Sequence, residues 1–441
     1  MQRGGTPLEA GGEAMSGGEM RAGTRGSRAL AGGIVLALML VACGTEEPTD
    51  PAAEAPEDVA DDPAIDDDPI FIGFTVSRTG SMAAFDWEPT QAAMMRIDEI
   101  NEEGGILGRQ VVYEVLDNQS DPALNGTNAV ELIDDGADII FTTSDFDFGA
   151  PAAIEAQNNG MFGAFLCASD PKTADRETIG DLVFSLCWGT NNEGAVMAEW
   201  AAQSQGWDTV YMLEDISIEY TKSLAWAFTE RFEQEGGEIV AADTFNALDP
   251  DLDISGQISR LRGHVDDIDA IILPSWIPPA ATVAAQIRDA GIDVPILGGT
   301  ANDGTIVPDI AGDISDYYAV TFGCYAYCAD TDKPELDDFA ASFEDTYGEL
   351  PPSTYTMKGY DWITLLAAAI EHAGTTDGPA IRDALQEITP METLSGSNDF
   401  TERWNQPQLR DGTIQVLDQG QWRFVERWVP EQVPDPEGFE G

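Results

Sequence analysis

The sequence predicts an α/β fold of two lobes, each with an open parallel sheet and helices on both of its faces. From Ile70 onwards, apolar runs of strand-like composition alternate with amphipathic helical stretches, and the alternation restarts after Cys187. The chain has 441 residues, 43% of them hydrophobic, which suits two or three domains with real cores. Open parallel sheets bind ligands beyond the carboxyl ends of their strands, so two facing lobes predict a small-molecule cleft.

Each element of the alternation follows from the local sequence. Ile70–Val76 (IFIGFTV) is typical of a buried strand, and a helix is predicted from about Pro89, in its first turn, to Asn101. In the first half, strands are then expected at 111–117, 137–143 and 161–168, and helices at 123–135 and from about 151. In the second half, strands are expected at 209–215, 238–245, 269–275 and 295–299, and helices at 193–203, 220–235, 255–262 and 279–290.

The N-terminal region predicts export and a lipid anchor. Three arginines precede an apolar run over 29–42, which has the length of a signal-peptide core and is too short to span a bilayer of about 30 Å. The run ends in LVAC, which resembles the bacterial lipobox, where the cysteine (here Cys43) receives the lipid; a plain secretory signal is the alternative. We expect a signal peptide with an N-terminal extension over 1–42, and a protein anchored to the outer face of the cell membrane by lipidated Cys43.

A disordered acidic tether is expected over 43–69. Between residues 44 and 68 the chain has eleven acidic residues, four prolines and no basic residue, so this segment repels itself and cannot bury a core.

Four cysteines remain beyond Cys43, and export permits disulfides. Cys167 and Cys187 end neighbouring apolar runs, while Cys324 and Cys328 are four residues apart, so we expect those two bridges, with free buried thiols as the alternative. The CxxxC spacing has no second Cys or His pair nearby and predicts no zinc site.

The six sequence blocks that follow one another from about Ile70 to Val429 carry a family resemblance. They are IGFTVSRTGSMAAFD, RIDEINEEGGILGRQVVYEVLDNQSDP, EGGEIVAADTF, QIRDAGIDVPILGG, DDFAASFEDTYGELPPSTYTMKGYDWITLLAAAIEHAG and IRDALQEI. In this order they resemble the leucine/isoleucine/valine-binding branch of the type I periplasmic binding proteins. The resemblance implies Rossmann-like lobes joined by a three-crossing hinge, and a monomer that delivers a small solute to the permease and ATPase subunits of an ABC importer.

The resemblance also implies lobe boundaries. Lobe 1 is expected at 70–188 plus 320–395 and lobe 2 at 189–319 plus 396–430, with closing strands from the segment RDGTIQVLDQGQWRFVERW and a C-terminal tail over 431–441.

The family holds an amino acid's carboxylate with main-chain N–H groups at a helix start and a hydroxyl on the next strand's end. The matching helix start here contains Phe148 and Gly149, and the matching hydroxyl is Ser169, with Cys167 close by at the strand's end. In this chain Asp145 and Asp147 stand in place of the family's serine-rich turn. Their carboxylates either cap the helix or repel an anionic ligand.

Aromatic walls and one carboxylate complete the site that the resemblance implies. Phe85, Tyr220 and Trp276 fall where the family places aromatic residues, which could lie over an ammonium group, and Trp87 follows close behind Phe85. Asp303 is the first candidate partner for that ammonium group, and Asp215 is the second. For each of these residues, a role in the core or in a turn is the alternative.

An amino acid, branched-chain or similar, is the expected ligand; amides, urea and aromatic carboxylates are alternatives, as is a sensory role for a membrane receptor. The sequence has no GxSxG or HExxH motif, and its two histidines (His264, His372) lie at predicted helix ends. We therefore expect no catalytic residue, no metal, no cofactor and no enzyme activity.

The charge excludes polyanionic partners. There are 80 Asp and Glu against 21 Lys and Arg, giving a formal charge of −59, and the four lysines are scattered. Such a chain repels nucleic acid and anionic lipid headgroups, so the membrane is contacted only through the lipid anchor. The tether holds eleven of the acidic residues, so most of the excess of acidic over basic residues lies in the lobes. This excess predicts a surface adapted to high salt; an ordinary acidic exported protein is the alternative.

The halophilic interpretation predicts that the melting temperature rises clearly between about 0.1 and about 2 M KCl, because the Debye length falls to about 3 Å at 1 M and screens the repulsion between carboxylates. Differential scanning calorimetry over this range measures the effect. A melting temperature that stays constant contradicts the interpretation.

Overall fold

A computed structural model describes residues 68–331, 333–400, 404–407 and 409–439. The expected signal peptide and Cys43 lie outside the described residues, as does the tether apart from Asp68 and Pro69. Within the described part, no helix is long and apolar enough to cross a membrane.

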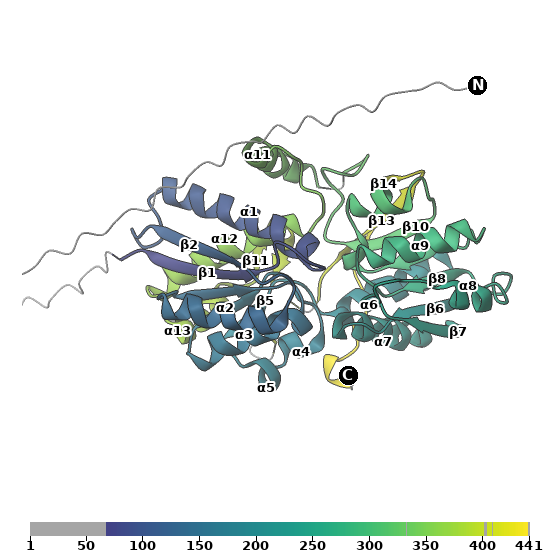
Figure 1. Cartoon of the computed structure of the whole chain (residues 1–441), viewed down its shortest axis with the longest axis horizontal. Coiled ribbons are helices and arrows are strands. Elements are labelled where there is room, and N and C mark those ends of the chain that lie inside the picture. Colours follow the sequence, from purple (N-terminus) through teal and green to yellow (C-terminus); the bar gives the residue numbers. More distant parts are fainter. Residues whose placement is uncertain (1–67, 332, 401–403, 408, 440–441) are drawn as a thin grey trace, which may run out of the picture. The chain divides into compact units, whose positions relative to one another are not determined.

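The sheet of lobe 1 has five parallel strands in the order β2-β1-β3-β4-β5 (Figure 1). These strands are β1 (Ile70–Val76), β2 (Val111–Asp117), β3 (Ile139–Thr142), β4 (Phe162–Phe165) and β5 (Val183–Ser185). One face is covered by α1 (Ala83–Glu102), α12 (Thr356–Ala373) and α13 (Gly378–Ile388), and the other by α2 (Pro122–Asp134) and α3 (Phe146–Asn158). The helices α4 (Pro171–Ala174) and α5 (Arg176–Ile179) follow β4.

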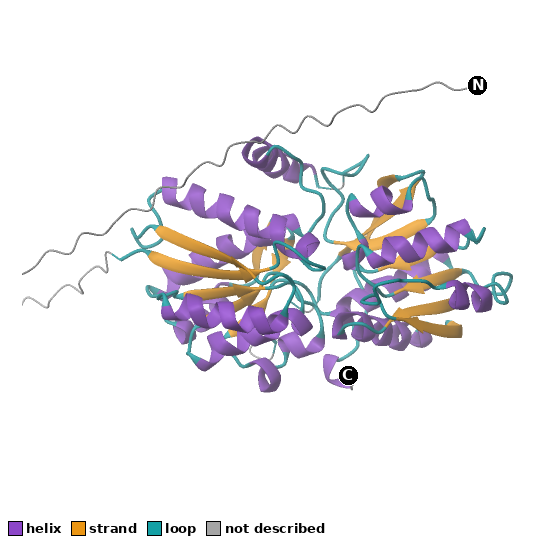
Figure 2. Cartoon of the chain, in the orientation of Figure 1, coloured by secondary structure: helices purple, strands orange, loops and turns teal. Residues whose placement is uncertain are grey.

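The sheet of lobe 2 has seven strands in the order β14-β13-β10-β9-β8-β6-β7. Its parallel part contains β6 (Thr209–Asp215), β7 (Glu238–Phe245), β8 (Ala270–Leu273), β9 (Ile296–Gly298) and β10 (Tyr317–Thr321). The strands β13 (Gly412–Asp418) and β14 (Gln421–Trp428) close it as an antiparallel pair. The helices are α6 (Thr190–Glu199), continued by a π-helical turn (Trp200–Gln205), then α7 (Glu219–Gln234), α8 (Ser255–Leu261), α9 (Pro279–Asp289) and α10 (Ile306–Ala311). The predicted α/β architecture with two lobes is confirmed (Figure 2).

The chain passes between the lobes three times: after β5, after β10 and before β13. The expected boundary at 319/320 falls inside β10, which belongs wholly to the sheet of lobe 2. The boundary at 395/396 splits the hairpin of β11 (Met391–Thr393) and β12 (Gly396–Asn398), which lies beside α12. A further helix, α11 (Asp337–Tyr347), lies between β10 and α12 in the sequence.

Helix α1 starts six residues before the predicted start, so Pro89 lies inside it and not in its first turn. Pro89 has no N–H to donate to the carbonyl of Phe85, four residues earlier. The Oγ of Ser144 donates to that carbonyl at 2.9 Å, so a residue from the end of β3 satisfies it. Helix α3 likewise starts at Phe146, with Pro151 inside, and not near residue 151.

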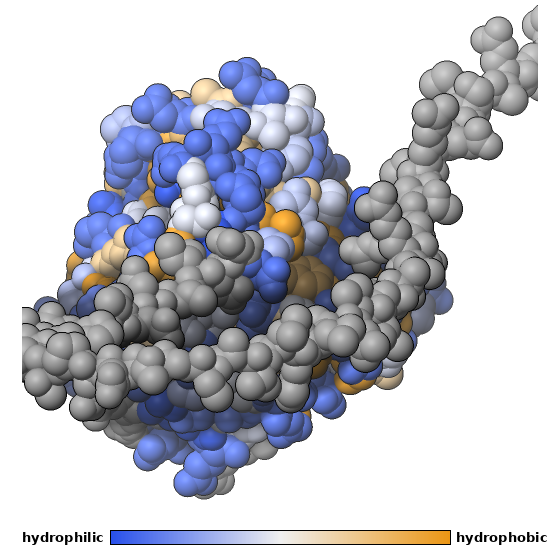
Figure 3. Space-filling view, turned by 90° about the vertical axis from the view of Figure 1, so that its left-hand side faces the viewer, coloured by the Kyte–Doolittle hydropathy of each residue, from blue (hydrophilic) through white to orange (hydrophobic). Residues whose placement is uncertain are grey.

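Hydrophilic residues dominate the end of lobe 1 that lies at the left of Figure 1, where the grey trace leaves it visible (Figure 3).

Some carboxylates are buried inside the lobes, and Glu193 is one of them. Glu193, in the first turn of α6, is fully buried and accepts hydrogen bonds from the N–H and Oγ1 of Thr300 at 2.6 and 3.1 Å and from the hydroxyl of Tyr220 at 2.8 Å. Burial raises the pKa of Glu193 to about 7, although these hydrogen bonds oppose the shift.

We predict that Glu193→Gln flattens the dependence of stability on pH. Because the pKa of Glu193 is raised in the folded state, its contribution to stability is full below about pH 4.5 and is lost as the pH rises through about 7. The wild-type protein should therefore lose up to about 1.4 kcal/mol of unfolding free energy per pH unit more than the variant in this window. Denaturant titrations at several pH values at constant salt measure it.

The matched control is Glu131→Gln, which changes an exposed glutamate on α2 and should leave the pH dependence as in the wild-type protein. Equal slopes for the wild-type protein and Glu193→Gln would show that Glu193 does not titrate in this range.

Candidate functional site

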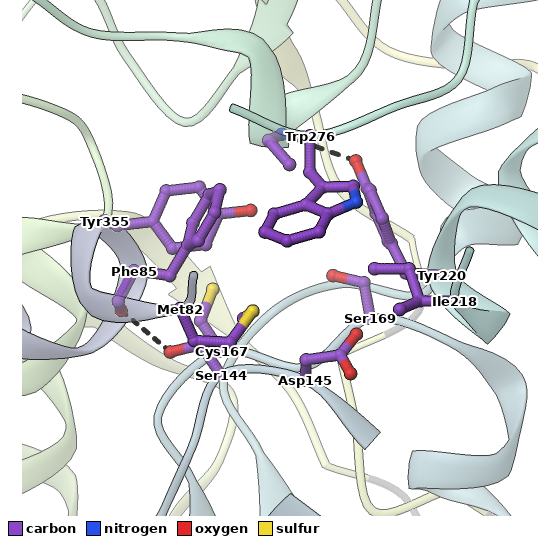
Figure 4. A pocket seen from close by; sticks show the side chains of 11 residues that line it. Met82, Phe85, Ser144, Asp145, Cys167, Ser169, Ile218, Tyr220, Trp276 and Tyr355 are labelled. Carbon is purple, nitrogen blue, oxygen red and sulfur yellow. Dashed lines mark hydrogen bonds between the residues drawn. The ribbon is translucent and has the colours of Figure 1, made fainter. Parts of the chain in front are cut away.

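A cavity lies where the strand-end loops of the two lobes meet (Figure 4). Its enclosed volume is only about 20 Å³, roughly the space of one water molecule, so the lobes must separate before a solute can enter. Its aromatic lining consists of Phe85, Tyr220, Trp276 and Tyr355. The remaining lining residues are Met82, Ser144, Asp145, Cys167, Ser169, Ile218 and Ala301.

The polar tips of the aromatic residues are bonded to protein groups around the cavity. The hydroxyl of Tyr220 donates to Glu193 at 2.8 Å and accepts from the N–H of Ala301 at 3.3 Å. The indole N–H of Trp276 donates to the Oγ of Ser217 at 3.2 Å, and the hydroxyl of Tyr355 lies 3.1 Å from the Oγ1 of Thr300.

The rings themselves pack together at the cavity. The centroid of Phe85 lies 5.0 Å from that of Tyr355, edge to face, and 6.4 Å from that of Trp276. Phe85 and Tyr355 come from lobe 1 and Trp276 from lobe 2, so aromatic contacts cross between the lobes.

Asp86 fixes the first turn of α1, which carries Phe85. Its carboxylate is fully buried and accepts hydrogen bonds from the N–H groups of Ser77 and Ser144, both at 2.8 Å. It thereby joins the ends of β1 and β3 to the first turn of α1. Burial raises the pKa of Asp86 to about 6, against the effect of these hydrogen bonds.

Asp145 and Ser169 place two polar groups in the cavity. Asp145 is the N-cap of α3 and accepts one long hydrogen bond, from the N–H of Phe148 at 3.4 Å. Burial, with repulsion from Asp147 and Asp170, raises the pKa of Asp145 well above its ordinary value. The Oγ of Ser169 is buried and has no hydrogen-bond partner in the described part of the chain.

Five of the nine expected ligand residues line the cavity: Phe85, Cys167, Ser169, Tyr220 and Trp276. Trp87 does not, because it lies on another face of α1, where the guanidinium of Arg78 is 4.3 Å from its ring centroid. Phe148 and Gly149 are buried in α3 behind Asp145. A Cβ at Gly149 would lie 2.8 Å from the ring of Phe165 and from the carbonyl of Thr143, so packing explains this glycine.

Asp303 lines a different hollow and is not available to a ligand in the cavity. Its Oδ2 accepts hydrogen bonds from the hydroxyls of Thr321, Thr354 and Tyr327 at 2.6 to 2.8 Å. Asp215, the second candidate, is also committed, to Ser275 and to the N–H groups of Ser217 and Ala247.

Six lining residues were not predicted from the sequence: Met82, Ser144, Asp145, Ile218, Ala301 and Tyr355. A signal existed for two of them. Asp145 stands at the helix start that the resemblance marks, and Tyr355 lies in the block STYTMKGYD. Met82 depends on where α1 begins, which Ser144 helps to fix from another loop.

Polar contacts also join the lobes beside the cavity. The first N–H of α7, that of Glu219, donates to Oδ2 of Asp147 in the first turn of α3 at 2.8 Å. Ile218, the N-cap of α7, provides no side-chain hydrogen bond, so a carboxylate from lobe 1 caps this helix of lobe 2. The Nζ of Lys172 in α4 lies 2.9 Å from Glu219, and the Nζ of Lys222 lies 2.7 Å from the same carboxylate within α7.

Two disulfides are present in the described part of the chain, and one of them contains the cavity residue Cys167. The structure joins Cys167 to Cys187, which connects the end of β4 to the first passage between the lobes, and Cys324 to Cys328. Among the described residues no group of three or more His, Cys, Asp or Glu side chains could hold a metal ion.

Comparisons with known proteins agree with this architecture. The Leu/Ile/Val-binding protein homolog 3 of Brucella melitensis is 24% identical over 335 residues, covering 76% of this chain and 87% of that protein. The leucine-, isoleucine-, valine-, threonine- and alanine-binding protein of Pseudomonas aeruginosa is 24% identical over 336 residues, covering 76% of this chain and 87% of its own length.

Solved structures share the fold. The branched-chain amino acid transporter substrate binding protein LivJ of Streptococcus pneumoniae, in complex with isoleucine, superposes with a TM-score of 0.71 at 24% identity, covering 83% of this chain and 100% of its own. The leucine binding protein LivK of Thermotoga maritima gives a TM-score of 0.71 at 24% identity, covering 82% of this chain and 99% of its own. The family described as periplasmic binding protein matches residues 69–421, most of the chain. The chain therefore belongs to the periplasmic binding protein family.

Proposed function

We propose that this protein is the extracytoplasmic solute-binding component of an ABC importer and that it captures a small amino compound, of the amino-acid class, in the cavity between its lobes. The observation that carries the proposal is the cavity itself, lined by aromatic residues from both lobes in a member of this family. The relative from Pseudomonas aeruginosa is named as a leucine-, isoleucine-, valine-, threonine- and alanine-binding protein, which supports a solute of that size.

The protein acts by binding and closure in this proposal, not by catalysis. A solute that contacts Phe85 and Tyr355 on one side and Trp276 on the other gains contacts only when the lobes are together, so binding favours the closed form. That form, a monomer held at the membrane by lipidated Cys43, would then dock on the permease.

A titration with amino acids, amides, urea and aromatic carboxylates tests this function. We expect at least one of these solutes to give binding heat in calorimetry and to raise the melting temperature, because a ligand that binds only the folded state stabilises it. Trp276→Ala should abolish both signals, whereas Trp87→Ala, which removes a tryptophan outside the cavity, should retain them. Absence of heat and of a thermal shift with every solute overturns the proposal.

The contacts between the lobes predict that substitutions of Lys172 and Lys222 change solute affinity differently. Lys172→Gln removes an ion pair that crosses between the lobes, and should weaken solute affinity by roughly 1.4- to fivefold, since partly exposed pairs contribute about 0.2 to 1 kcal/mol. Lys222→Gln removes an ion pair with the same glutamate inside lobe 2, and should leave affinity unchanged or slightly higher.

Titrations of both variants at low salt measure this difference, because salt screens exposed pairs. Equal loss of affinity in the two variants would show that the bridge of Lys172 does not stabilise the closed form.

A further inference from the structure

The cavity offers a ligand a carboxylate and a free hydroxyl, but no positive charge. Its lining contains no Lys, Arg or His. The polar tips of Tyr220, Trp276 and Tyr355 are hydrogen-bonded to protein groups, and the Oγ of Ser144 donates to the carbonyl of Phe85. Among the side chains that line the cavity, this leaves the carboxylate of Asp145 and the hydroxyl of Ser169.

Asp145 occupies the helix terminus that could otherwise hold an anion. It is 3% exposed, and its side chain accepts from the N–H of Phe148 while its carbonyl accepts from the N–H of Gly149. A ligand carboxylate placed there would face this buried carboxylate and those of Asp147 and Asp170 beyond it. Lost hydration would oppose it, and its charge would raise the already elevated pKa of Asp145 further, whereas an ammonium group would lower that pKa and favour the ionised carboxylate.

Ser169 provides an independent indication of a bound polar group. It is 3% exposed and its Oγ makes no hydrogen bond with any described residue. Figure 4 shows this hydroxyl directed toward the space beneath Trp276, with the Asp145 carboxylate below it. A buried hydroxyl without a partner is costly, so a ligand atom that bonds to it recovers that cost.

The aromatic rings suit a cation more than an anion. Ring faces carry partial negative charge and attract ammonium groups, and a desolvated carboxylate nearby adds to this attraction. Lys172, three residues after Ser169 in α4, forms an ion pair with Glu219 and does not line the cavity. The formal charge of −59 also attracts cations to the protein.

We propose that the cavity selects an organic cation: an amino compound whose ammonium group lies against Asp145, Ser169 and the aromatic rings, and whose carboxyl group is absent or neutralised. This inference rests on the proposed function and narrows its solute to amines and to amides or esters of amino acids. Zwitterionic amino acids bind more weakly, because Asp145 occupies the helix start that would otherwise hold their carboxylate.

Four probes of one shape test the inference by calorimetric titration of the full chain. They are leucine, leucinamide, 3-methylbutylamine and 4-methylpentanoate, which share one branched side chain. Leucine carries both charges, leucinamide and 3-methylbutylamine carry only the positive charge, and 4-methylpentanoate carries only the negative charge. We expect leucinamide and 3-methylbutylamine to bind at least roughly tenfold more tightly than leucine, and 4-methylpentanoate not to bind. Leucine binding as tightly as leucinamide, or more tightly, overturns the inference.

Two aspartates provide matched variants. Asp145→Asn keeps a good N-cap on α3 and removes the charge, so it should weaken binding of 3-methylbutylamine by at least roughly tenfold. Asp121→Asn makes the same change at the N-cap of α2, which has the same length and lies outside the cavity, and should have no effect. Unchanged amine affinity in Asp145→Asn overturns the role of Asp145.

The outcomes separate the inference from the proposed function. If a solute in the wider panel binds but neither cationic probe does, the function stands and the inference is wrong. If no solute of any charge binds, both are wrong.

Discussion

Positive charge is scarce in this chain, and its buried carboxylates are therefore held mainly by N–H and O–H groups. Asp86 depends on two backbone N–H groups, Glu193 on Thr300 and Tyr220, and Asp303 on hydroxyl groups. Each of these acids fixes a loop at the carboxyl end of a strand or the start of a helix. Since the cavity is formed by those same loops, its shape depends on carboxylates that no cation neutralises.

The boundary between the lobes is held by the same chemistry. Asp147 supplies to α7 the cap that its own N-terminus lacks, and Lys172 reaches across to the adjacent glutamate. Aromatic rings from both lobes also contact one another at the cavity, so separation of the lobes breaks apolar and polar contacts together. A solute that fills the cavity therefore acts on a closed form that the protein alone already stabilises in part.

The sequence predicted the sheets well because apolar periodicity and glycine turns are local signals. Phe85, Ser169, Tyr220 and Trp276, which line the cavity, could be named as candidates from the sequence because each follows a strand or begins a helix. Trp87 lies outside the cavity for a physical reason: α1 starts early, since Ser144 accepts the role that Pro89 cannot fill and donates to the carbonyl of Phe85, and this contact comes from a distant loop. Residues two apart on a helix differ by about 200° in direction, so Phe85 and Trp87 cannot both face one cavity.

Because Asp147 caps α7 across the boundary between the lobes, the separation of the lobes depends on the anions in the surrounding solution. When the lobes separate, the start of α7 loses its carboxylate and presents unpaired N–H groups to the solution, where a dissolved anion can replace it. Chloride at molar concentration would then compete with Asp147 and favour the open form, apart from any screening. The ionic composition outside the cell would thus adjust how readily this protein releases its cargo.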